Sequence, residues 1–299
     1  MPESYMELTS SHIPFSMESA QNEGVNDSIV DVDAYGRAGY YVARGLFSPE
    51  EVSAFLVHFM RIHGAGGEGW TERPIEPDSP DPLRQYPRLL QMHRGDELSR
   101  DYLLDNRLRK ALTELLGTEP YGVQTMMYFK PAGARGQALH QDQRFLRVEP
   151  GTCMAAWLAL DDCTSENGCL QVVPGTHTID MLCPITSDRS KSFTRETVPV
   201  PPGYEVKDLH MKAGDVVFFN GQLIHGSGPN ESNGFRRILV GHYIVGEAEK
   251  VARYYFPVYR FDRSTVDLEI NEGGGACGEY SADGVFELKS TVEEALAAH

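Results

Sequence analysis

Apolar residues follow two different periods along the chain, and the period changes near residue 120. Before that point a leucine stripe has the three-to-four-residue spacing of an amphipathic helix, and Gly117 follows it, as is typical of a helix C-terminus. The stripe consists of Leu104, Leu108, Leu112 and Leu115. Beyond residue 120 the apolar runs are short and lie between Gly, Pro, Asn and Asp clusters, which is typical of β-strands. We predict strands at Gln124–Phe129, Met154–Leu160, Leu170–Val173, Val216–Phe219 and Ile238–Val245.

A further strand and helix are predicted ahead of the leucine stripe. The run Gly39–Gly45 is rich in Tyr and Val, which indicates a strand. After it, Ser48 can cap a helix, Pro49 suits the first turn, and Glu51 stands where a capping box requires it. The sequence therefore predicts a helix from Ser48 to about Ile62.

Three stretches show neither period. Residues 1–29 are polar, and we expect a flexible arm there. Residues 64–87 carry four glycines and five prolines, and residues 177–205 form a second polar, proline-containing insertion between predicted strands. Long segments of this kind often cover binding sites, so both are candidate lids.

Helices followed by many strands predict a mainly β fold with flanking helices, built on a sandwich or barrel. The chain has 299 residues, of which 41% are hydrophobic and 23% charged, so it is globular and long enough for one domain or two. The early helices lack the strands for a sheet of their own. We therefore predict one domain over 30–299, with a helical buttress at about 48–117 against a β core at about 120–250.

Charge and hydropathy narrow the possible partners. A formal net charge of −16 opposes binding to nucleic acid and to anionic membranes. No apolar run is long enough for a transmembrane helix, and the N-terminus lacks the pattern of a signal peptide. We expect a cytoplasmic protein that acts on a small molecule and binds neither nucleic acid nor membrane. The sequence does not indicate the oligomeric state.

Cysteine usage gives a separate expectation. The chain has five cysteines, an odd number, and no C-x-x-C pair. This pattern argues against a disulfide framework and against a thiolate zinc site, so we predict buried free thiols. The five are Cys153, Cys163, Cys169, Cys183 and Cys277.

The strongest candidate for chemistry is an H-x-D pair in the segment Leu139–Asp142. In an extended chain residues i and i+2 point to the same side, so the His140 imidazole and the Asp142 carboxylate would project together. Such pairs are common by chance and also occur in exposed turns. A metal site needs a third ligand.

His225 is the candidate for that ligand, because it stands in a glycine-flanked segment just after the predicted strand Val216–Phe219. Two histidines and one carboxylate form the facial triad that holds Fe(II) and leaves the opposite face open for a cosubstrate and O2. The alternative is a histidine satisfied within the core, which is the commoner situation for an isolated histidine.

Arg236 lies eleven residues further on, at the head of the predicted strand Ile238–Val245. A guanidinium there would enter the barrel interior, where it requires an anion, and its planar fork matches a carboxylate. Arg236 is therefore a candidate anchor for a dicarboxylate cosubstrate. Its neighbour Arg237 should face the opposite side of the strand and pair at the surface.

Several blocks, in this order, resemble the phytanoyl-CoA dioxygenase family of Fe(II)/2-oxoglutarate-dependent oxygenases. The similarity runs from about Phe129 to Val245 and is weaker over Gly39–Ile62. The blocks are Leu139–Asp142, Ala156–Trp157, Glu166–Leu170, Val173–His177, Lys212–Phe219, Ile224–Asn230 and Gly234–Arg236.

This resemblance implies a double-stranded β-helix core, which is a cupin-like jelly roll. It implies that His140, Asp142 and His225 bind Fe(II), and that Arg236 and Ser227 hold the distal carboxylate of 2-oxoglutarate, which is consumed together with O2. Halogenating relatives carry a small residue in place of the carboxylate. Because Asp142 is present, hydroxylation or a related oxidation is favoured.

Four more residues match family positions. Trp157 and Met126 match positions beside the cosubstrate, although core packing explains them equally well. Lys130 matches a lysine that contacts 2-oxoglutarate in the related ectoine hydroxylases, and Gln124 matches a glutamine that contacts the substrate there. With the triad complete, the following histidines are expected to be structural: His177, His210 and His242.

The implied activity is hydroxylation, or another oxidation, of an unactivated C–H bond in a small molecule, with release of succinate and CO2. A specialised metabolite is the expected substrate. The negative net charge and the lack of a Lys/Arg cluster in the sequence argue against a CoA thioester. Two alternatives stay open: a metal-binding jelly roll that senses or binds without turnover, and a cupin-type isomerase or hydrolase with the same ligands.

Overall fold

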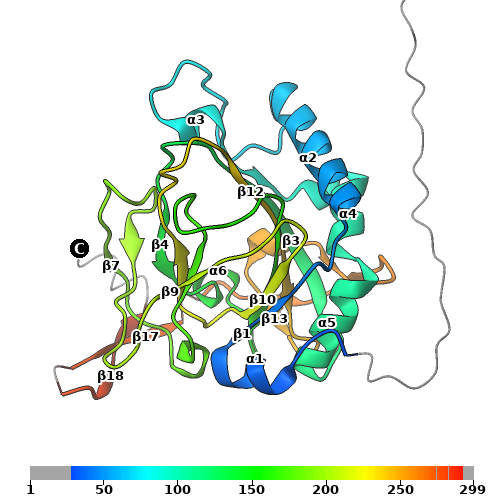
Figure 1. The fold of residues 1–299 in the computed structure, drawn as a ribbon. Helices are drawn as coiled ribbons and strands as arrows, with labels where there is room; N and C mark the ends of the chain where they lie inside the picture. Colours follow the sequence, from blue (N-terminus) through cyan, green and yellow to red (C-terminus); the bar gives the residue numbers. More distant parts are fainter. Residues whose placement is uncertain (1–27, 274, 282, 292–299) are drawn as a thin grey trace, which may run out of the picture.

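The computed structural model describes residues 28–273, 275–281 and 283–291. Two β-sheets lie at its centre, with helices α2, α4 and α5 on one side and the hairpin of β17 and β18 extending on the other (Figure 1). Residues 1–27 of the predicted arm lie outside the described residues. The mainly β fold predicted from the sequence is confirmed.

The larger sheet has eight strands in the order β1-β10-β5-β12-β3-β14-β15, with β2 pairing to β3 beside this path. Its central pairs are antiparallel. The six strands predicted from the sequence are all present, with ends that differ by up to three residues. The strands of this sheet are β1 (Tyr40–Ala43), β2 (Leu89–Leu90), β3 (Tyr121–Lys130), β5 (Cys153–Ala159), β10 (Val216–Asn220), β12 (Arg236–Ile244), β14 (Val258–Tyr259) and β15 (Thr265–Val266).

The smaller sheet has four strands in the order β4-β11-β6-β9 and closes over the inner face of the larger one. Trp157, Val217 and Val240 of the large sheet belong to the same buried cluster as Leu170 and Val172 of the small sheet. This face-to-face packing makes the jelly roll. The strands are β4 (Gln137–His140), β6 (Leu170–Val172), β9 (Lys207–Leu209) and β11 (His225–Ser227).

Helices cover the outer face of the large sheet. Residues that alternate with the inner-facing ones, such as Leu158 and Phe218, pack there against Phe59 and Leu112 of the helices. The capping box predicted at the start of α2 is confirmed, because both its hydrogen bonds form. The helices are α1 (Val32–Ala38), α2 (Pro49–Gly64), α3 (Pro82–Gln85), α4 (Glu97–Leu103), α5 (Asn106–Leu116) and α6 (Gln143–Leu146), with 3-10 turns η1 (Met92–Arg94), η2 (Thr176–Thr178) and η3 (Arg253–Tyr255).

The leucine stripe is shared between two helices, which corrects the single helix predicted there. Leu104 is the C-cap residue that follows α4, and the Asp105 side chain then caps α5 by accepting a hydrogen bond from the Arg107 backbone N–H at 2.7 Å. Gly117 ends α5 in the left-handed conformation, at φ 78°, as expected for a helix terminus. Asp105 interrupts the stripe because its side chain competes for backbone donors.

The two breaker-rich segments contain more structure than the sequence predicted. Residues 64–87 include α3, and residues 177–205 include the short paired strands β7 (Ile185–Thr186) and β8 (Glu196–Thr197). The other strands outside the two main sheets are β13 (Lys250–Val251), β16 (Glu269–Ile270), β17 (Ala276–Tyr280) and β18 (Phe286–Thr291).

A disulfide joins Cys183 to Cys277, so the prediction of free thiols was wrong for these two residues. The bridge links the 177–205 segment to β17 across a sequence separation of 94 residues. The parity and spacing of cysteines could not reveal it, because the pairing depends on the C-terminal hairpin docking beside Leu182. The remaining cysteines are free and buried, as predicted: Cys153, Cys163 and Cys169.

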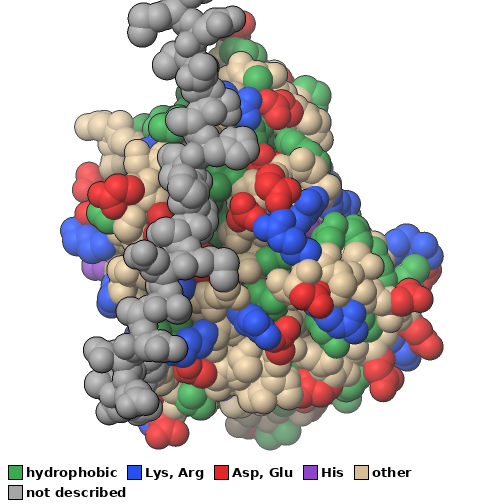
Figure 2. Space-filling view, turned by 90° about the vertical axis from the view of Figure 1, so that its right-hand side faces the viewer, with side chains coloured by type: hydrophobic (Ala, Val, Ile, Leu, Met, Phe, Trp, Pro, Cys, Tyr) green, Lys and Arg blue, Asp and Glu red, His purple; other side chains and the backbone are tan. Residues whose placement is uncertain are grey.

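Charged side chains are mixed on the surface shown in Figure 2, where Lys and Arg lie among Asp and Glu instead of forming one field of a single sign. No helix among the described residues is long and apolar enough to span a membrane.

Candidate active site

Three potential metal ligands meet between the two sheets. His140 ends β4 and His225 begins β11, and these residues lie directly opposite each other in the antiparallel pair. Asp142 lies at the start of α6, in helical conformation, so the extended segment predicted to reach Asp142 ends at His140 instead. Its carboxylate still lies 3.4 Å from His140 Nε2 and 3.6 Å from His225 Nε2. All three donor groups fall within 4.8 Å of one another.

The two histidines are oriented by their own backbone. His140 Nδ1 lies 2.9 Å from the carbonyl oxygen of Ala138, and His225 Nδ1 lies 2.9 Å from that of Leu223. A carbonyl oxygen only accepts, so each Nδ1 carries the proton and each Nε2 presents a lone pair to the shared centre. Metal-binding histidines typically have this arrangement. The donor set therefore fits a divalent metal such as Fe(II).

The protonation states at the centre also suit a cation. Burial alone would raise the pKa of the Asp142 carboxyl, but the neighbouring histidines His225, His140 and His242 together hold it well below its usual value. Burial lowers the pKa of His225 to about 4. At neutral pH the centre thus offers the Asp142 carboxylate and the neutral His225 imidazole, which are the forms that bind a metal.

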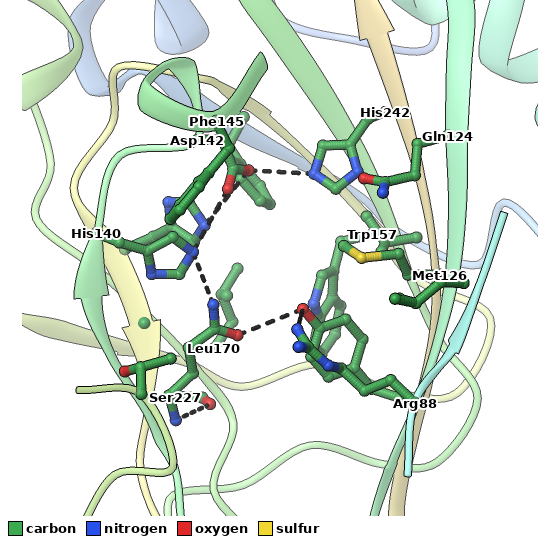
Figure 3. A pocket seen from close by; sticks show the side chains of 18 of the residues that line it. Arg88, Gln124, Met126, His140, Asp142, Phe145, Trp157, Leu170, Ser227 and His242 are labelled. Carbon is green, nitrogen blue, oxygen red and sulfur yellow. Dashed lines mark hydrogen bonds and ion pairs between the residues drawn. The ribbon is translucent and has the colours of Figure 1, made fainter. Parts of the chain in front are cut away.

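A cavity of about 330 Å³, which we call the inner pocket, contains this centre (Figure 3). All the residues predicted to contact metal, cosubstrate or substrate line it, including Trp157, Met126 and Gln124. Figure 3 shows His140 and Asp142 facing His242 and Gln124 across the pocket. The fold therefore brings together the whole set that the sequence suggested.

Two buried cations line the same pocket. Arg236 is 2% exposed, its Nε has no hydrogen-bond partner among the residues that the structure describes, and its guanidinium lies 5.4 Å from the centre of the Trp157 ring. Lys130 is 3% exposed and donates hydrogen bonds to Ser227 Oγ at 2.8 Å and to the Gly228 carbonyl oxygen at 2.6 Å. Neither cation forms an ion pair with a carboxylate in the described part of the chain. An incoming carboxylate fits this arrangement.

His242, predicted from the sequence to be structural, lines the inner pocket. It is 3% exposed, its Nε2 lies 3.2 Å from Asp142 Oδ2, and its Nδ1 has no partner within the described part of the chain. The signal was present in the sequence, because His242 shares the inward face of β12 with Arg236 and Val240 through the two-residue alternation.

A chain of hydrogen bonds crosses the pocket, and no sequence motif indicates it. Arg88 Nη1 donates to the Tyr128 hydroxyl at 3.1 Å, and this hydroxyl donates to Gln137 Oε1 at 3.4 Å. Gln137 Nε2 lies 3.0 Å from His140 Nε2. Arg88 lies outside every motif, and only the tertiary fold brings it to the pocket.

The other residues considered in the sequence lie away from the centre. Arg237 turns outward and pairs with Asp161 at 2.7 Å, as expected. His177 packs beside Gly39, and a Cβ at that glycine would lie 2.5 Å from the imidazole. His210 is exposed and hydrogen-bonded to Ser165.

A second group of potential ligands, Cys169, Asp208 and His210, has donor atoms within 4.8 Å of one another on the small sheet. Burial raises the pKa of the Cys169 thiol to about 11, which disfavours the thiolate that a metal needs. Asp208 already accepts a hydrogen bond from Gln171. This group is therefore satisfied without a metal.

The chain is similar in sequence to several known proteins. The family model for phytanoyl-CoA dioxygenase matches residues 35–238, which is more than half of the chain. A phytanoyl-CoA dioxygenase of Arabidopsis thaliana is 32% identical over 167 residues, covering 54% of this chain and 58% of that protein. The ectoine dioxygenase of Stutzerimonas stutzeri is 29% identical over 220 residues, covering 67% and 70%. The chain spans little more than half the length of the plant relatives, 58% and 56%.

Solved structures share the fold. EctD from S. alaskensis, solved with 2-oxoglutarate and 5-hydroxyectoine, superposes with a TM-score of 0.58 at 24% identity and covers 75% of this chain and 79% of that one. The epimerase SnoN from nogalamycin biosynthesis gives a TM-score of 0.58 at 21% identity, covering 73% and 80%. These similarities support the jelly-roll fold.

Proposed function

The chain belongs to the phytanoyl-CoA dioxygenase family, and on that premise we propose that it is an Fe(II)- and 2-oxoglutarate-dependent oxygenase. Its reaction would hydroxylate an unactivated C–H bond of a small molecule and release succinate and CO2. The observation that carries the proposal is the meeting, in one cavity, of a His-Asp-His centre and two buried cations that form no ion pair among the described residues.

The metal would be held by His140, Asp142 and His225. When bound, iron and 2-oxoglutarate supply the oxidising power for attack on the C–H bond by way of O2. The protein's share is to fix the ligands: the carbonyl groups of Ala138 and Leu223 set the imidazole tautomers.

The cosubstrate would be held at its far carboxylate by Arg236, with Lys130 and Ser227 beside it. Lys130 and Ser227 already share a hydrogen bond, so an arriving carboxylate meets a hydroxyl and an ammonium group in fixed positions. Trp157 supports the guanidinium from one side. Binding the carboxylate here orients the opposite end of 2-oxoglutarate toward the histidines.

The rest of the pocket would bind substrate and exclude water. Leu170, Phe219 and Val240 give apolar walls, and Gln124 and His242 add polar groups at the end occupied by Asp142. Phe193 and Thr194 of the 177–205 segment also line the pocket, so this predicted lid lies at the site.

The direct test is anaerobic addition of Fe(II) and 2-oxoglutarate to the protein. We expect a visible charge-transfer band that Asp142→Ala abolishes, and succinate formation when O2 is admitted. Asp161→Ala provides a matched control, because that carboxylate pairs with Arg237 outside the site and its loss should leave the band intact. Absence of a band from the unaltered protein would contradict the proposal.

The two rival functions make different predictions. A module that only binds metal has no use for Arg236 and Lys130, whose unpaired charges disfavour that alternative. A cupin-type isomerase or hydrolase would turn over its substrate without consuming O2 or forming succinate. Measuring both with candidate substrates separates it from an oxygenase.

A further inference from the structure

A second cavity of about 290 Å³ adjoins the inner pocket, and we call it the outer pocket. The two cavities share four lining residues: Arg88, Tyr128, Lys130 and Phe193. Figure 3 shows Arg88 on the wall of the inner pocket opposite His140. A molecule in one cavity can therefore extend along this shared wall into the other.

Arginine dominates the lining of the outer pocket. The six arginines are Arg73, Arg84, Arg88, Arg135, Arg189 and Arg195. No Lys/Arg cluster is visible in the sequence, but the fold forms one at the outer pocket, because the six arginines come from separate stretches of the chain. Two of the stretches are the breaker-rich segments 64–87 and 177–205. The absence of a basic cluster can thus no longer argue against a strongly anionic substrate.

Acidic residues offset only part of this charge. Arg88 pairs with Glu72 at 2.6 Å and Arg135 pairs with Asp81 at 2.7 Å. Arg73 also lies 3.7 Å from Glu72, and Arg84 pairs with Glu76, which does not line the outer pocket.

The guanidinium groups of Arg189 and Arg195 have no hydrogen-bond or ion-pair partner among the described residues. Both side chains are exposed where they reach the outer pocket. In a chain with a net charge of −16, a cavity with excess positive charge is not a consequence of overall composition. Guanidinium groups that converge on one space favour an oxyanion there.

We propose that the outer pocket binds an oxyanion of the substrate, such as a carboxylate, phosphate or sulfate group. The remainder of the substrate passes Arg88 and Phe193 to present its C–H bond in the inner pocket. This role rests on the function proposed above. The carboxylate of 2-oxoglutarate has a cation of its own in Arg236, which lines the inner pocket and not the outer one.

The test uses sulfate, which mimics the oxyanion and does not chelate iron. The full chain, loaded anaerobically with Fe(II) and 2-oxoglutarate, is titrated with sulfate by calorimetry. We compare it with Arg189→Gln/Arg195→Gln, which removes the two unpaired charges. The control Arg37→Gln/Lys207→Gln makes the same charge change at exposed positions outside the outer pocket.

We expect sulfate to bind the unaltered protein, the outer-pocket variant to bind it at least tenfold more weakly, and the control to stay within twofold. The charge-transfer band and the affinity for 2-oxoglutarate should be unchanged in both variants. Absence of sulfate binding, or equal binding by the outer-pocket variant, would overturn the inference. A loss of affinity for 2-oxoglutarate in that variant would also overturn the inference, because it would show that these arginines bind the cosubstrate.

The two proposals fail separately. A normal charge-transfer band without arginine-dependent sulfate binding would contradict the anion site and remain consistent with an oxygenase. Arginine-dependent sulfate binding without a band would support the anion site and contradict the oxygenase function. Once succinate release identifies a substrate, Arg189→Gln/Arg195→Gln should raise its KM and leave kcat nearly unchanged. A neutral substrate with an unchanged KM would contradict the inference.

Discussion

Lys130 and Arg236 lie directly opposite each other on β3 and β12, and both side chains are buried. Opposite residues of an antiparallel pair project from the same face, so the two cations share one space. Burial, followed by repulsion from Arg236, holds the pKa of Lys130 well below its usual value, and burial also lowers the pKa of Arg236. Two buried like charges favour binding of an anion between them.

The first prediction concerns this pair. Arg236→Gln should weaken 2-oxoglutarate binding by about 10- to 100-fold, because a hydrogen bond to a charged group contributes roughly 1.5–3 kcal/mol. Anaerobic titration of the charge-transfer band measures the change. Arg237→Gln is the neighbouring control, since Arg237 pairs with Asp161 and should not affect the affinity. Equal effects of the two substitutions would show that Arg236 has no specific role.

The second prediction concerns His242, which contacts Asp142 Oδ2 from strand β12 of the larger sheet. His242→Leu should weaken metal binding by roughly 10- to 100-fold, as loss of a group that orients a metal ligand typically does. His242→Gln retains an N–H donor and should restore much of the affinity. Calorimetric titration with Co(II) compares the variants. If Leu and Gln behave alike, the hydrogen bond to Asp142 does not position the carboxylate.

Local sequence patterns were sufficient for much of the fold. Short apolar runs in Val216–Phe219 and Ile238–Val245 predicted strands, because a sheet buried on one face by a second sheet and on the other by helices keeps both sets of side chains apolar. The H-x-D segment indicated two potential ligands, because residues i and i+2 of an extended chain point to the same side. In the structure Asp142 reaches the centre from the start of a helix instead.

Features that depend on distant segments could not be predicted in this way. Arg88 and Arg195 meet at the outer pocket from positions more than a hundred residues apart, and no local period relates them. The partner of Cys183 lies on a hairpin that follows the predicted core. Tertiary packing alone sets these relationships, so a single sequence carries no signal for them.

The third prediction follows from the disulfide. The unfolded, unreduced protein should show three reactive thiols and the reduced protein five, as counted with a thiol reagent. Cys183→Ser/Cys277→Ser should lower the free energy of unfolding by up to about 4 kcal/mol, because the bridge closes a long loop in the unfolded chain. Urea denaturation measures the loss. Five thiols before reduction would contradict the pairing.

A control is needed to show that the reducing agent changes stability only by breaking the disulfide. Cys153→Ser removes a buried free thiol and leaves the bridge in place. Adding reductant should destabilise this variant by as much as it destabilises the unaltered protein, and should leave Cys183→Ser/Cys277→Ser unchanged. A response of the double variant to reductant would show that the bridge is not the group being reduced.

The last prediction is a pH dependence of stability set by His93, which lies outside both pockets. This side chain is fully buried, its Nδ1 lies 3.1 Å from Thr125 Oγ1, and burial lowers its pKa from 6.5 to about 3. As the pH falls, the His93 imidazole therefore binds a proton near pH 6.5 in the unfolded chain, but only near pH 3 in the folded protein. The contribution of His93 to the free energy of unfolding therefore decreases as the pH falls from about 6.5 to about 3.

Between pH 7 and pH 5 the contribution lost amounts to about 2 kcal/mol, from the free energy linked to one pKa unit. His93→Asn keeps a hydrogen-bonding group near Thr125 but cannot titrate, so its stability should decline by about 2 kcal/mol less over the same range. Urea denaturation at the two pH values measures both proteins. His210→Asn removes an exposed histidine and should follow the unaltered protein. If the free energy of unfolding declines equally in the unaltered protein and in His93→Asn, His93 is not held neutral by its burial.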